Sequence, residues 1–282
     1  MSITVAVVAQ GAMGAGTGAA LVKGGARVVT SVEGRSSASA ARAAEAGMEA
    51  VSDAALVEAD LILSIVPPGE ALAFAQRMAP HLKAASRKPV FADMNAVSPQ
   101  TVALIAEVIA QTYAPFADGG IIGGPPKAGY EGPAFYCSGP AAEYVSVLSD
   151  HGLDIRIMDG PVGAASALKM SYAGITKGLT ALSSMMMLAA TRAGADRGLA
   201  SEVAESQPDL TAWFQRQTPG MYAKAYRWVA EMREIADFVR DDPAAAKLFE
   251  AAAEFYERMA ADHAGDQRES AALSAFLKEA KR

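Results

Sequence analysis

The chain has 282 residues, of which 51% are hydrophobic and 20% are charged, and its formal net charge is −6. A chain of this length is typical of two domains, and its apolar share is sufficient for a sizeable core. Because the net charge is negative and the basic residues are scattered, the composition argues against nucleic acid and against an anionic membrane surface as partners.

Strand and helix patterns alternate over the first part of the chain. The N-terminus shows no basic segment followed by a long apolar run, so we expect no signal peptide. Apolar strands are expected at residues 3–9, 26–32, 59–67, 89–95, 116–122 and 134–139, and helices at 13–25, 37–47, 69–82 and 98–111. This alternation implies right-handed crossovers and a mostly parallel sheet covered on both faces. We therefore predict an α/β domain over residues 1–159.

The single cysteine, Cys137, lies in the expected strand 134–139. One cysteine cannot form an internal disulfide, and this fits a reducing cytoplasm, where we expect the protein to be located. The apolar surroundings of Cys137 favour a buried packing residue over a reactive thiol.

Strand signals disappear after Pro161. Residues 163–194 show one long helical pattern, and three or four further helices are expected after it. A capping residue followed by proline predicts helix starts at Thr218–Pro219 and at Asp242–Pro243. We predict an all-helical domain over residues 160–282, which is joined to the first domain by the long helix and serves in substrate binding and dimerisation.

The long helix carries the apolar run LTALSSMMMLAA at residues 179–190. It is roughly half the length that a membrane-spanning helix needs, so we interpret it as buried. Met185 to Met187 cover every face of this helix, which fits either ordinary core or a subunit interface. Because helices attached to one long helix would leave apolar faces uncovered, we expect a homodimer.

The stretch VAVVAQGAMGAG, residues 5–16, has the spacing of a dinucleotide-binding glycine loop between a strand and a helix. Ala9 replaces the first glycine, which is tolerable if its φ angle is negative. Gly11 would let a pyrophosphate approach the backbone, and Gly14 would let the helix pack closely on the sheet. With Ala12 and Met13 between them, these residues place the phosphates at a helix N-terminus and predict a Rossmann-type domain.

The end of the second strand carries conflicting signals about the cofactor. Glu33 lies nineteen residues after Gly14, where an acidic side chain would bind the 2′-hydroxyl of NAD. Arg35 and Ser36 would instead suit the 2′-phosphate of NADP, although Arg35 also fits a solvated loop. We favour NADP, because Glu33 can turn away from the site, and keep NAD as the alternative.

Five motifs resemble the β-hydroxyacid dehydrogenase and 6-phosphogluconate dehydrogenase superfamily, and they occur in the family's order. They are GAMGAGTGAAL (11–21), SIVPP (64–68), DMNAVSPQT (93–101), DGGIIGGPPKAG (118–129) and VGAASALKM (162–170). More closely, EGRS (33–36) and SPQT (98–101) resemble a subgroup of NADP-binding oxidoreductases whose helical C-terminal domain has no assigned function. The resemblance implies the same two-domain fold and a hydride-transferring enzyme.

The resemblance places the family's catalytic lysine at Lys169. Hydride transfer from a secondary alcohol needs a general base for the hydroxyl proton, and desolvation lowers the pKa of a buried lysine toward working pH. The alternative is a lysine that extends to solvent from the helix edge. Lys177 lies eight residues later on the same helical face, where it could hold a substrate anion or lie at the surface.

The resemblance also implies cofactor contacts at Val66 and Pro67. Asn95 stands where its amide could bind the nicotinamide carboxamide or the substrate. Gly123 and Gly124, with Lys127 beside them, could offer N–H groups to a carboxylate or a developing oxyanion, or could simply form a turn.

Two departures concern the substrate site. Ile122 replaces the serine of the family's substrate loop, and Ala173 replaces an asparagine four residues after Lys169. Tyr172 is a nearby polar alternative. Aromatic residues of the second half fit either helical core or a roomier, apolar or aromatic substrate pocket; they are Trp213, Phe214, Tyr222, Tyr226 and Trp228.

We therefore interpret the chain as a cytoplasmic, NADP-dependent oxidoreductase acting on a hydroxy acid or a related secondary alcohol. The alternatives are an imine reductase or reductive aminase, and a non-catalytic NADP-binding protein. His81, His151 and His263 are far apart in the sequence and no Cys/His cluster occurs, so no metal site is expected.

Overall fold

The computed structural model describes residues 3–126, 129–130 and 132–280. The chain divides into two compact units, Met1–Met170 and Ser171–Arg282, and each is described by itself. The division lies within the long helix, and the domain boundary expected between residues 159 and 160 stays a prediction.

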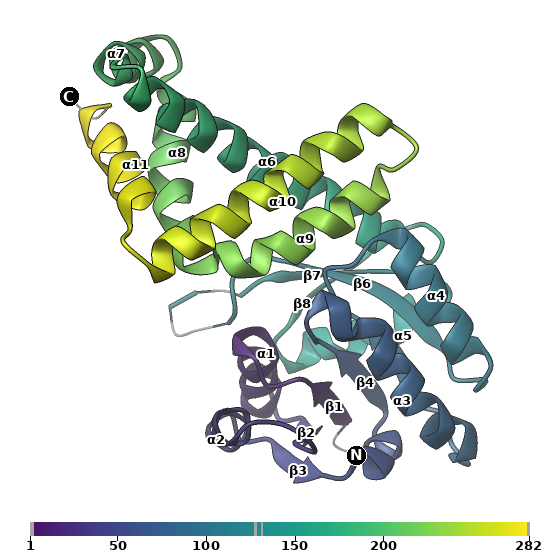
Figure 1. Cartoon of the computed structure of the whole chain (residues 1–282). Helices are drawn as coiled ribbons and strands as arrows, with labels where there is room; N and C mark the ends of the chain where they lie inside the picture. Colours follow the sequence, from purple (N-terminus) through teal and green to yellow (C-terminus); the bar gives the residue numbers. More distant parts are fainter. Residues whose placement is uncertain (1–2, 127–128, 131, 281–282) are drawn as a thin grey trace. The chain divides into compact units, whose positions relative to one another are not determined.

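The first unit is built on one sheet of eight strands in the order β3-β2-β1-β4-β5-β6-β7-β8 (Figure 1). The strands are β1 (Thr4–Val8), β2 (Arg27–Ser31), β3 (Glu49–Val51), β4 (Leu61–Ser64), β5 (Val90–Asp93), β6 (Phe116–Ile122), β7 (Ala134–Ser138) and β8 (Asp154–Ile157). All neighbouring strands are parallel except β6 and β7. The predicted, mostly parallel α/β sheet is confirmed. Strands β3 and β8 were not expected, because both are short and partly exposed and neither has an apolar run.

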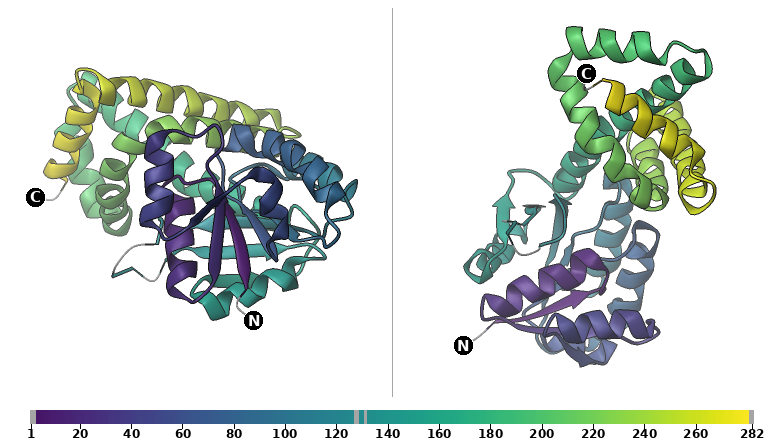
Figure 2. Two further views of the ribbon diagram at one scale, coloured as in Figure 1. Left: turned by 90° about the horizontal axis from the view of Figure 1, so that it is seen from below. Right: turned by 90° about the vertical axis from the view of Figure 1, so that its left-hand side faces the viewer.

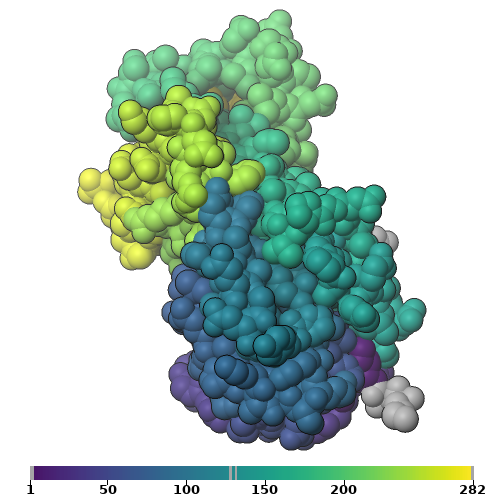
Figure 3. Space-filling model, turned by 90° about the vertical axis from the view of Figure 1, so that its right-hand side faces the viewer, coloured from purple at the N-terminus to yellow at the C-terminus, as the bar shows by residue number. Residues whose placement is uncertain are grey.

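Helices cover both faces of the sheet (Figure 2). They are α1 (Ala12–Lys23), α2 (Ser37–Glu45), α3 (Ala71–Ala84), α4 (Pro99–Ala110) and the short α5 (Ala142–Val145). Side chains of β1 alternate between two buried clusters: Val5 and Val7 pack with α1, α2 and α5, whereas Ala6 and Val8 pack with α3 and α4. The outer surfaces of α3 and α4 are visible in Figure 3. Burial on both faces explains why the strands are continuously apolar.

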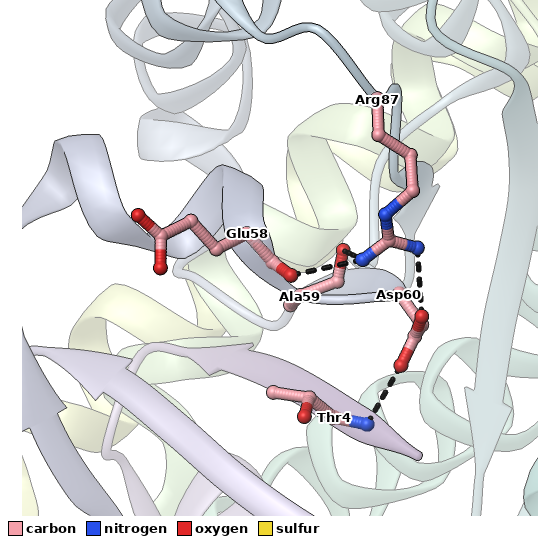
Figure 4. Close-up of polar contacts among 5 residues, drawn as sticks. All are labelled: Thr4, Glu58, Ala59, Asp60 and Arg87. Carbon is pink, nitrogen blue, oxygen red and sulfur yellow. Dashed lines mark hydrogen bonds and ion pairs between the residues drawn. The ribbon is translucent and has the colours of Figure 1, made fainter. Parts of the chain in front are cut away.

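The amino-terminal edge of the sheet is held by one polar cluster (Figure 4). Asp60, just before β4, accepts hydrogen bonds from the Thr4 N–H at 2.8 Å and from the Arg87 guanidinium at 2.7 Å. Arg87 also donates to the carbonyl oxygens of Glu58 and Ala59 at 3.0 and 3.2 Å. These bonds tie the start of β1 and the loop before β5 to the start of β4.

The second unit is entirely helical among its described residues. Helix α6 (Ala164–Arg192) enters from the first unit and is followed by α7 (Asp196–Ser206), α8 (Pro208–Met221), α9 (Ala225–Phe238), α10 (Pro243–Ala264) and α11 (Arg268–Glu279). The prediction of three or four helices after α6 was too low. Asp242 caps α10 as predicted, accepting from the N–H groups of Ala244 and Ala245 at 3.0 and 3.2 Å.

The helix start predicted at Thr218–Pro219 is wrong. Pro219 lies inside the last turn of α8, and Pro208 occupies the first turn instead. Pro219 removes the backbone hydrogen bond to the carbonyl four residues earlier, and α8 nevertheless continues through it to Met221. Pro208 follows Gln207, which makes no side-chain cap, so the start of α8 lacks the signal of a capping residue before proline that Thr218–Pro219 carries.

Helix α6 packs closely on α10 through two glycines. A Cβ atom at Gly174 or Gly178 would lie 3.2 or 3.1 Å from the ring of Phe249. On the same side, the Tyr256 hydroxyl donates to the Lys177 carbonyl oxygen at 2.6 Å. This face of α6 is therefore buried against α10.

Candidate functional site

The candidate site lies at the carboxyl edge of the first unit's sheet. Strand β1 is flanked by β2 on one side and β4 on the other, so the strand order reverses there. The register places Val8, Ser64, Asp93 and Asp118 side by side at the ends or in the middle of neighbouring strands. In open α/β sheets, ligands bind outside the carboxyl ends of the strands at such a reversal.

The glycine loop between β1 and α1 has the local geometry that its sequence predicted. Gly11 precedes α1 with extended backbone, φ −70° and ψ −178°. A Cβ atom at Gly14 would lie 1.7 Å from the Ala9 carbonyl oxygen, whereas one at Gly11 would meet no atom within 4 Å. Among the described non-glycine residues, only Tyr113 and Gln267 have a positive φ, so Ala9 meets the condition for replacing glycine. Gly14 is thus needed by the fold, and Gly11 leaves open space.

The loop after β2 carries the residues that are expected to determine whether NADP or NAD binds. The Glu33 carboxylate accepts a hydrogen bond from the Asp53 N–H at 3.4 Å. Gly34 has a φ of +67°, which turns the chain into α2. Ser36 is the cap of α2, with its hydroxyl accepting from the Ser39 N–H at 3.3 Å, and Arg35 beside it is half-buried.

Arg42 is a residue of this region that the sequence analysis missed. From α2, its Nε donates to the Gln10 carbonyl oxygen at 2.7 Å, and a terminal nitrogen donates to the Ser39 hydroxyl at 3.0 Å. It therefore connects the glycine loop to the first turn of α2. Its spacing of three residues from Ser39 on the same helix was the available signal.

The side chain of Asn95 makes hydrogen bonds with residues at the ends of β4 and β5. Its Oδ1 accepts from the Val66 N–H at 2.7 Å, and its Nδ2 donates to the Ser64 hydroxyl at 2.8 Å and to Asp93 Oδ1 at 2.5 Å. Both N–H donors of the amide are used in this way. In this arrangement Asn95 holds the turn that carries Val66 and Pro67.

Asp93 is fully buried in this network. Burial, together with the nearby Asp118 carboxylate, raises its pKa to about 7, against the lowering effect of its hydrogen bond with Asn95. Burial, and then Asp118, also raises the pKa of the Cys137 thiol to about 12. Cys137 has 0% exposure, so the expectation of a buried packing residue is confirmed.

Lys169 lies in the second turn of α6 and is half-buried. A Cβ atom at Gly120 in β6 would come within 2.9 Å of the Lys169 Cβ. The backbone of α6 at Lys169 therefore passes directly over β6 at Gly120. Gly120 lies two residues before Ile122, the last residue of that strand. Its assignment as the proton carrier stays a prediction.

The carboxyl end of β6 and the segment after it carry Ile122, Gly123 and Gly124. Ile122 is half-buried, and both glycines are exposed. Gly123 has a φ of +128°, and a Cβ atom there would lie 2.7 Å from the Tyr130 hydroxyl. A side chain is thus excluded at Gly123 by both conformation and space. Lys127, expected beside these glycines, lies outside the described residues.

The remaining predicted substrate residues belong to α6 in the second unit. Tyr172 is 49% exposed, whereas Ala173 is buried at 1%. Lys177 is ion-paired with Glu231, and its Nζ lies 5.1 Å from the centroid of the Trp228 ring. With its side chain only 16% exposed, Lys177 is not a surface residue, and its charge is balanced by Glu231.

The aromatic residues of the second unit pack mainly on one another. Phe214 is buried with Trp213 at its edge, and Trp228 meets Tyr256 edge-on with centroids 5.2 Å apart. Tyr222 shares a hydrogen bond with the Ser274 hydroxyl at 3.1 Å. Tyr226 differs, since it is 66% exposed. Core packing therefore accounts for most of this set.

Residues 3–126, 129–130 and 132–280 contain no group of three or more His, Cys, Asp or Glu side chains that could hold a metal ion. No helix in this part of the chain is long and apolar enough to cross a membrane. His151 instead makes a hydrogen bond through Nδ1 with the Gly24 carbonyl oxygen at 2.8 Å.

Sequence comparison identifies two regions. The profile of the NAD binding domain of 6-phosphogluconate dehydrogenase matches residues 4–149, about half of the chain. A domain of unknown function (DUF1932) matches residues 190–259. A protein of Methanothermus fervidus, described as an uncharacterized 28.5 kDa protein in the 7S RNA 5′ region, is 27% identical over 215 residues, which are 75% of this chain and 81% of that protein.

Similar folds occur among solved structures. A conserved hypothetical protein from Sinorhizobium meliloti 1021 is 27% identical with a TM-score of 0.72, covering 99% of this chain and 96% of that one. The 3-hydroxyisobutyrate dehydrogenase of Mycobacterium tuberculosis, solved with L-serine, is 21% identical with a TM-score of 0.75, covering 98% and 99%. At 21% identity, the similarity to the M. tuberculosis enzyme shows only that the two proteins share a fold. The resemblance inferred from the five motifs is confirmed.

Proposed function

Because the chain belongs to the family defined by the NAD-binding domain of 6-phosphogluconate dehydrogenase, we propose that it is an NADP-dependent oxidoreductase. It transfers a hydride between the nicotinamide and a hydroxy acid or related secondary alcohol. The observation that carries the proposal is the glycine loop at the reversal of strand order. There Gly14 brings α1 onto β1, while open space remains at Gly11.

The cofactor fits the residues of this loop and the next. The pyrophosphate would be held at the N-terminus of α1, where the first N–H groups of a helix have no partner within the helix. The choice of NADP is supported by Glu33, whose carboxylate is bonded to the Asp53 N–H. Arg35 and Ser36 supply a planar cation and a hydroxyl for a 2′-phosphate. Val66 and Pro67 would lie beside the cofactor, in the turn held by Asn95.

Lys169 is the proposed general acid and base. When bound, the nicotinamide supplies or accepts the hydride. Lys169 takes the hydroxyl proton during oxidation and returns it during reduction. The position of its backbone over β6, near Ile122 and the two glycines, supports this role. The backbone N–H groups of Gly123 and Gly124 are the proposed donors to a substrate carboxylate or oxyanion.

The substrate is proposed to carry an apolar or aromatic part. Ile122 provides no hydrogen-bonding group where the motif resemblance implies a serine, and Ala173, where it implies an asparagine, is buried at 1%. Tyr172, 49% exposed, is the polar side chain nearest to Ala173 in the sequence. Lys177 would bind a substrate anion only by giving up part of its pairing with Glu231, so we give it a secondary role.

A Lys169→Ala variant tests the proposal. The wild type is screened with NADPH against ketones, keto acids and imines, and with NADP+ against alcohols, following the absorbance of the reduced cofactor. The proposal expects turnover of a carbonyl or alcohol substrate that Lys169→Ala loses while it still binds NADPH. Lys247→Ala, at an exposed lysine of α10, is the matched control. Full turnover by Lys169→Ala would refute the lysine's role, turnover of imines alone would favour an imine reductase, and no turnover would favour a non-catalytic protein.

We also propose a homodimer formed through α6. Tyr172, Ile175, Leu182 and Met186 are between 48% and 70% exposed and follow one face of the helix. Residues 172 and 175 and residues 182 and 186 lie almost symmetrically about residue 179. The apolar face formed by these four residues could therefore pack against the same face of a second copy, with the two helices antiparallel about a two-fold axis. No charged residue occurs between Lys177 and Arg192. Sedimentation velocity should show a dimer that Leu182→Lys dissociates, and a wild-type monomer at micromolar concentration would refute the proposal.

A further inference from the structure

The first turn of α6 is capped from outside the helix. The residues before it, Val162 and Gly163, have no polar side chain that could cap it. Instead, Asp118 in β6 accepts at Oδ2 from the N–H groups of Gly163 and Ser166, at 2.9 and 3.1 Å. A carboxylate at a helix N-terminus satisfies otherwise unpaired donors and interacts favourably with the helix dipole.

Two serines complete this cap. The Ser166 hydroxyl donates to Asp118 Oδ1 at 2.6 Å, and the Ser138 hydroxyl of β7 donates to Asp118 Oδ2 at 3.0 Å. The Ser138 oxygen also accepts from the Ala165 N–H at 3.0 Å. Asp118, Ser138 and Ser166 all have 0% exposure. Hydrogen bonds to a buried carboxylate are short and strong, so the cap fixes α6 on two adjacent strands.

The same strand face brings α6 close at Lys169. Gly120 lies two residues after Asp118 and so faces the same side of the sheet. A Cβ atom at Gly120 would lie 2.9 Å from both the Ala165 carbonyl oxygen and the Lys169 Cβ. Lys169 in turn lies three residues after Ser166, about one turn along the helix. Two residues of β6 therefore meet two residues of α6. Asp118 accepts the hydrogen bond of Ser166, and Gly120 lies against Lys169.

We propose that Asp118 is a positioning residue for Lys169: acting through Ser166, it fixes where the lysine amine lies, while Gly120 provides the space. The function of this arrangement rests on the proposed role of Lys169, but the positioning itself does not. A misplacement of a reacting group by about 1 Å lowers a rate by about a hundredfold. The cap holds the helix one turn before the lysine, where a small tilt would displace the long side chain.

The experiment measures the reactivity of Lys169 directly. Full-length protein is treated with trinitrobenzenesulfonate, and peptide mass spectrometry gives the labelling rate of Lys169 relative to exposed Lys247 in the same molecule. The variants are Asp118→Asn, Ser166→Ala and Gly120→Ala. The control is Ser184→Ala, because Ser184 is also a fully buried serine of α6 and its hydroxyl has no hydrogen-bond partner among the described residues.

We expect the labelling ratio to change severalfold in Asp118→Asn, Ser166→Ala and Gly120→Ala and to stay at the wild-type value in Ser184→Ala. On a substrate found by screening, kcat should fall about tenfold to a hundredfold with little change in the KM for NADPH. If Asp118→Asn does not fold, the labelling ratio of Ser166→Ala, which lacks only one hydroxyl, still tests the proposal. Variants with lower melting temperatures but an unchanged labelling ratio would show that the cap only stabilises the fold and would overturn the proposal. That result does not depend on whether Lys169→Ala keeps its activity. The positioning role of Asp118 and the acid–base role of Lys169 can therefore be refuted independently of each other.

Discussion

Replacing Gly14 with alanine should damage the fold, whereas the same change at Gly11 should damage only cofactor binding. The added Cβ at Gly14 would lie 1.7 Å from the Ala9 carbonyl oxygen, and contacts closer than 3.0 Å force a shift. The end of β1 and the start of α1 must therefore separate by at least 1.3 Å, which is 3.0 minus 1.7 Å. Overpacking of this kind costs about 3 kcal/mol, and alanine in a helix recovers about 1 kcal/mol. The net loss in the free energy of unfolding is about 2 kcal/mol.

At Gly11 the backbone already has a φ of −70°, and, chain neighbours aside, an added Cβ meets no described atom within 4 Å. The free energy of unfolding of Gly11→Ala should therefore stay within about 0.5 kcal/mol of the wild type. The methyl group would occupy the space proposed for the pyrophosphate, so the Kd for NADPH should rise about tenfold or more, equivalent to about 1.4 kcal/mol.

Urea denaturation and calorimetric titration with NADPH measure the two effects. Gly198→Ala is the matched control, since a Cβ atom at Gly198 in α7 would meet no described atom within 4 Å other than the adjoining backbone of its own helix, and the variant should gain about 1 kcal/mol from helix propensity. A Gly14→Ala protein as stable as the wild type would refute the close packing of α1 on β1. A Gly11→Ala protein with wild-type affinity for NADPH would refute the phosphate site.

Three further predictions follow from particular side chains. Arg42→Ala removes the bond between α2 and the Gln10 carbonyl, so its affinity for NADPH should fall more than its affinity for NADH; an equal effect on both would show that Arg42 does not shape a 2′-phosphate site. Burial raises the pKa of Asp93 from 3.8 to about 7, so between these pH values the folded state binds more protons than the unfolded state, and stability should decrease as pH rises through this range. Asp93→Asn should flatten that dependence in urea titrations at several pH values, and an unchanged slope would count against a protonated Asp93. Because Cys137 has 0% exposure and a pKa raised to about 12, it should react with Ellman's reagent only after unfolding, and rapid reaction of the native protein would contradict its burial.

The sequence predicts the long apolar elements well, because hydrophobic periodicity and capping residues are local signals. The strands of the sheet centre, the glycine loop and the start of α10 at Asp242 belong to this group. Strand β3 was missed because its three residues, Glu49–Val51, are held by pairing with β2 rather than by their own pattern. The start of α8 was missed because Gln207 before Pro208 is not a capping residue, whereas Thr218 before Pro219 imitates a helix start inside α8.

The parts of the site that were missed all depend on contacts distant in the sequence. Arg42 meets Gln10 across 32 residues, and Lys177 pairs with Glu231 across 54. The cap of α6 needs Asp118 and Ser138, which reach the helix from 48 and 27 residues away. A single sequence shows which residues could make such bonds, but only the fold brings them together.

The most direct measurement for the central claim is a calorimetric titration of the wild-type protein with NADPH and, in parallel, with NADH. The account predicts one site per chain that binds NADPH in the micromolar range or tighter and binds NADH more weakly. Preference for NADH would contradict the reading of Arg35 and Ser36, and the absence of binding by either nucleotide would contradict the proposed function.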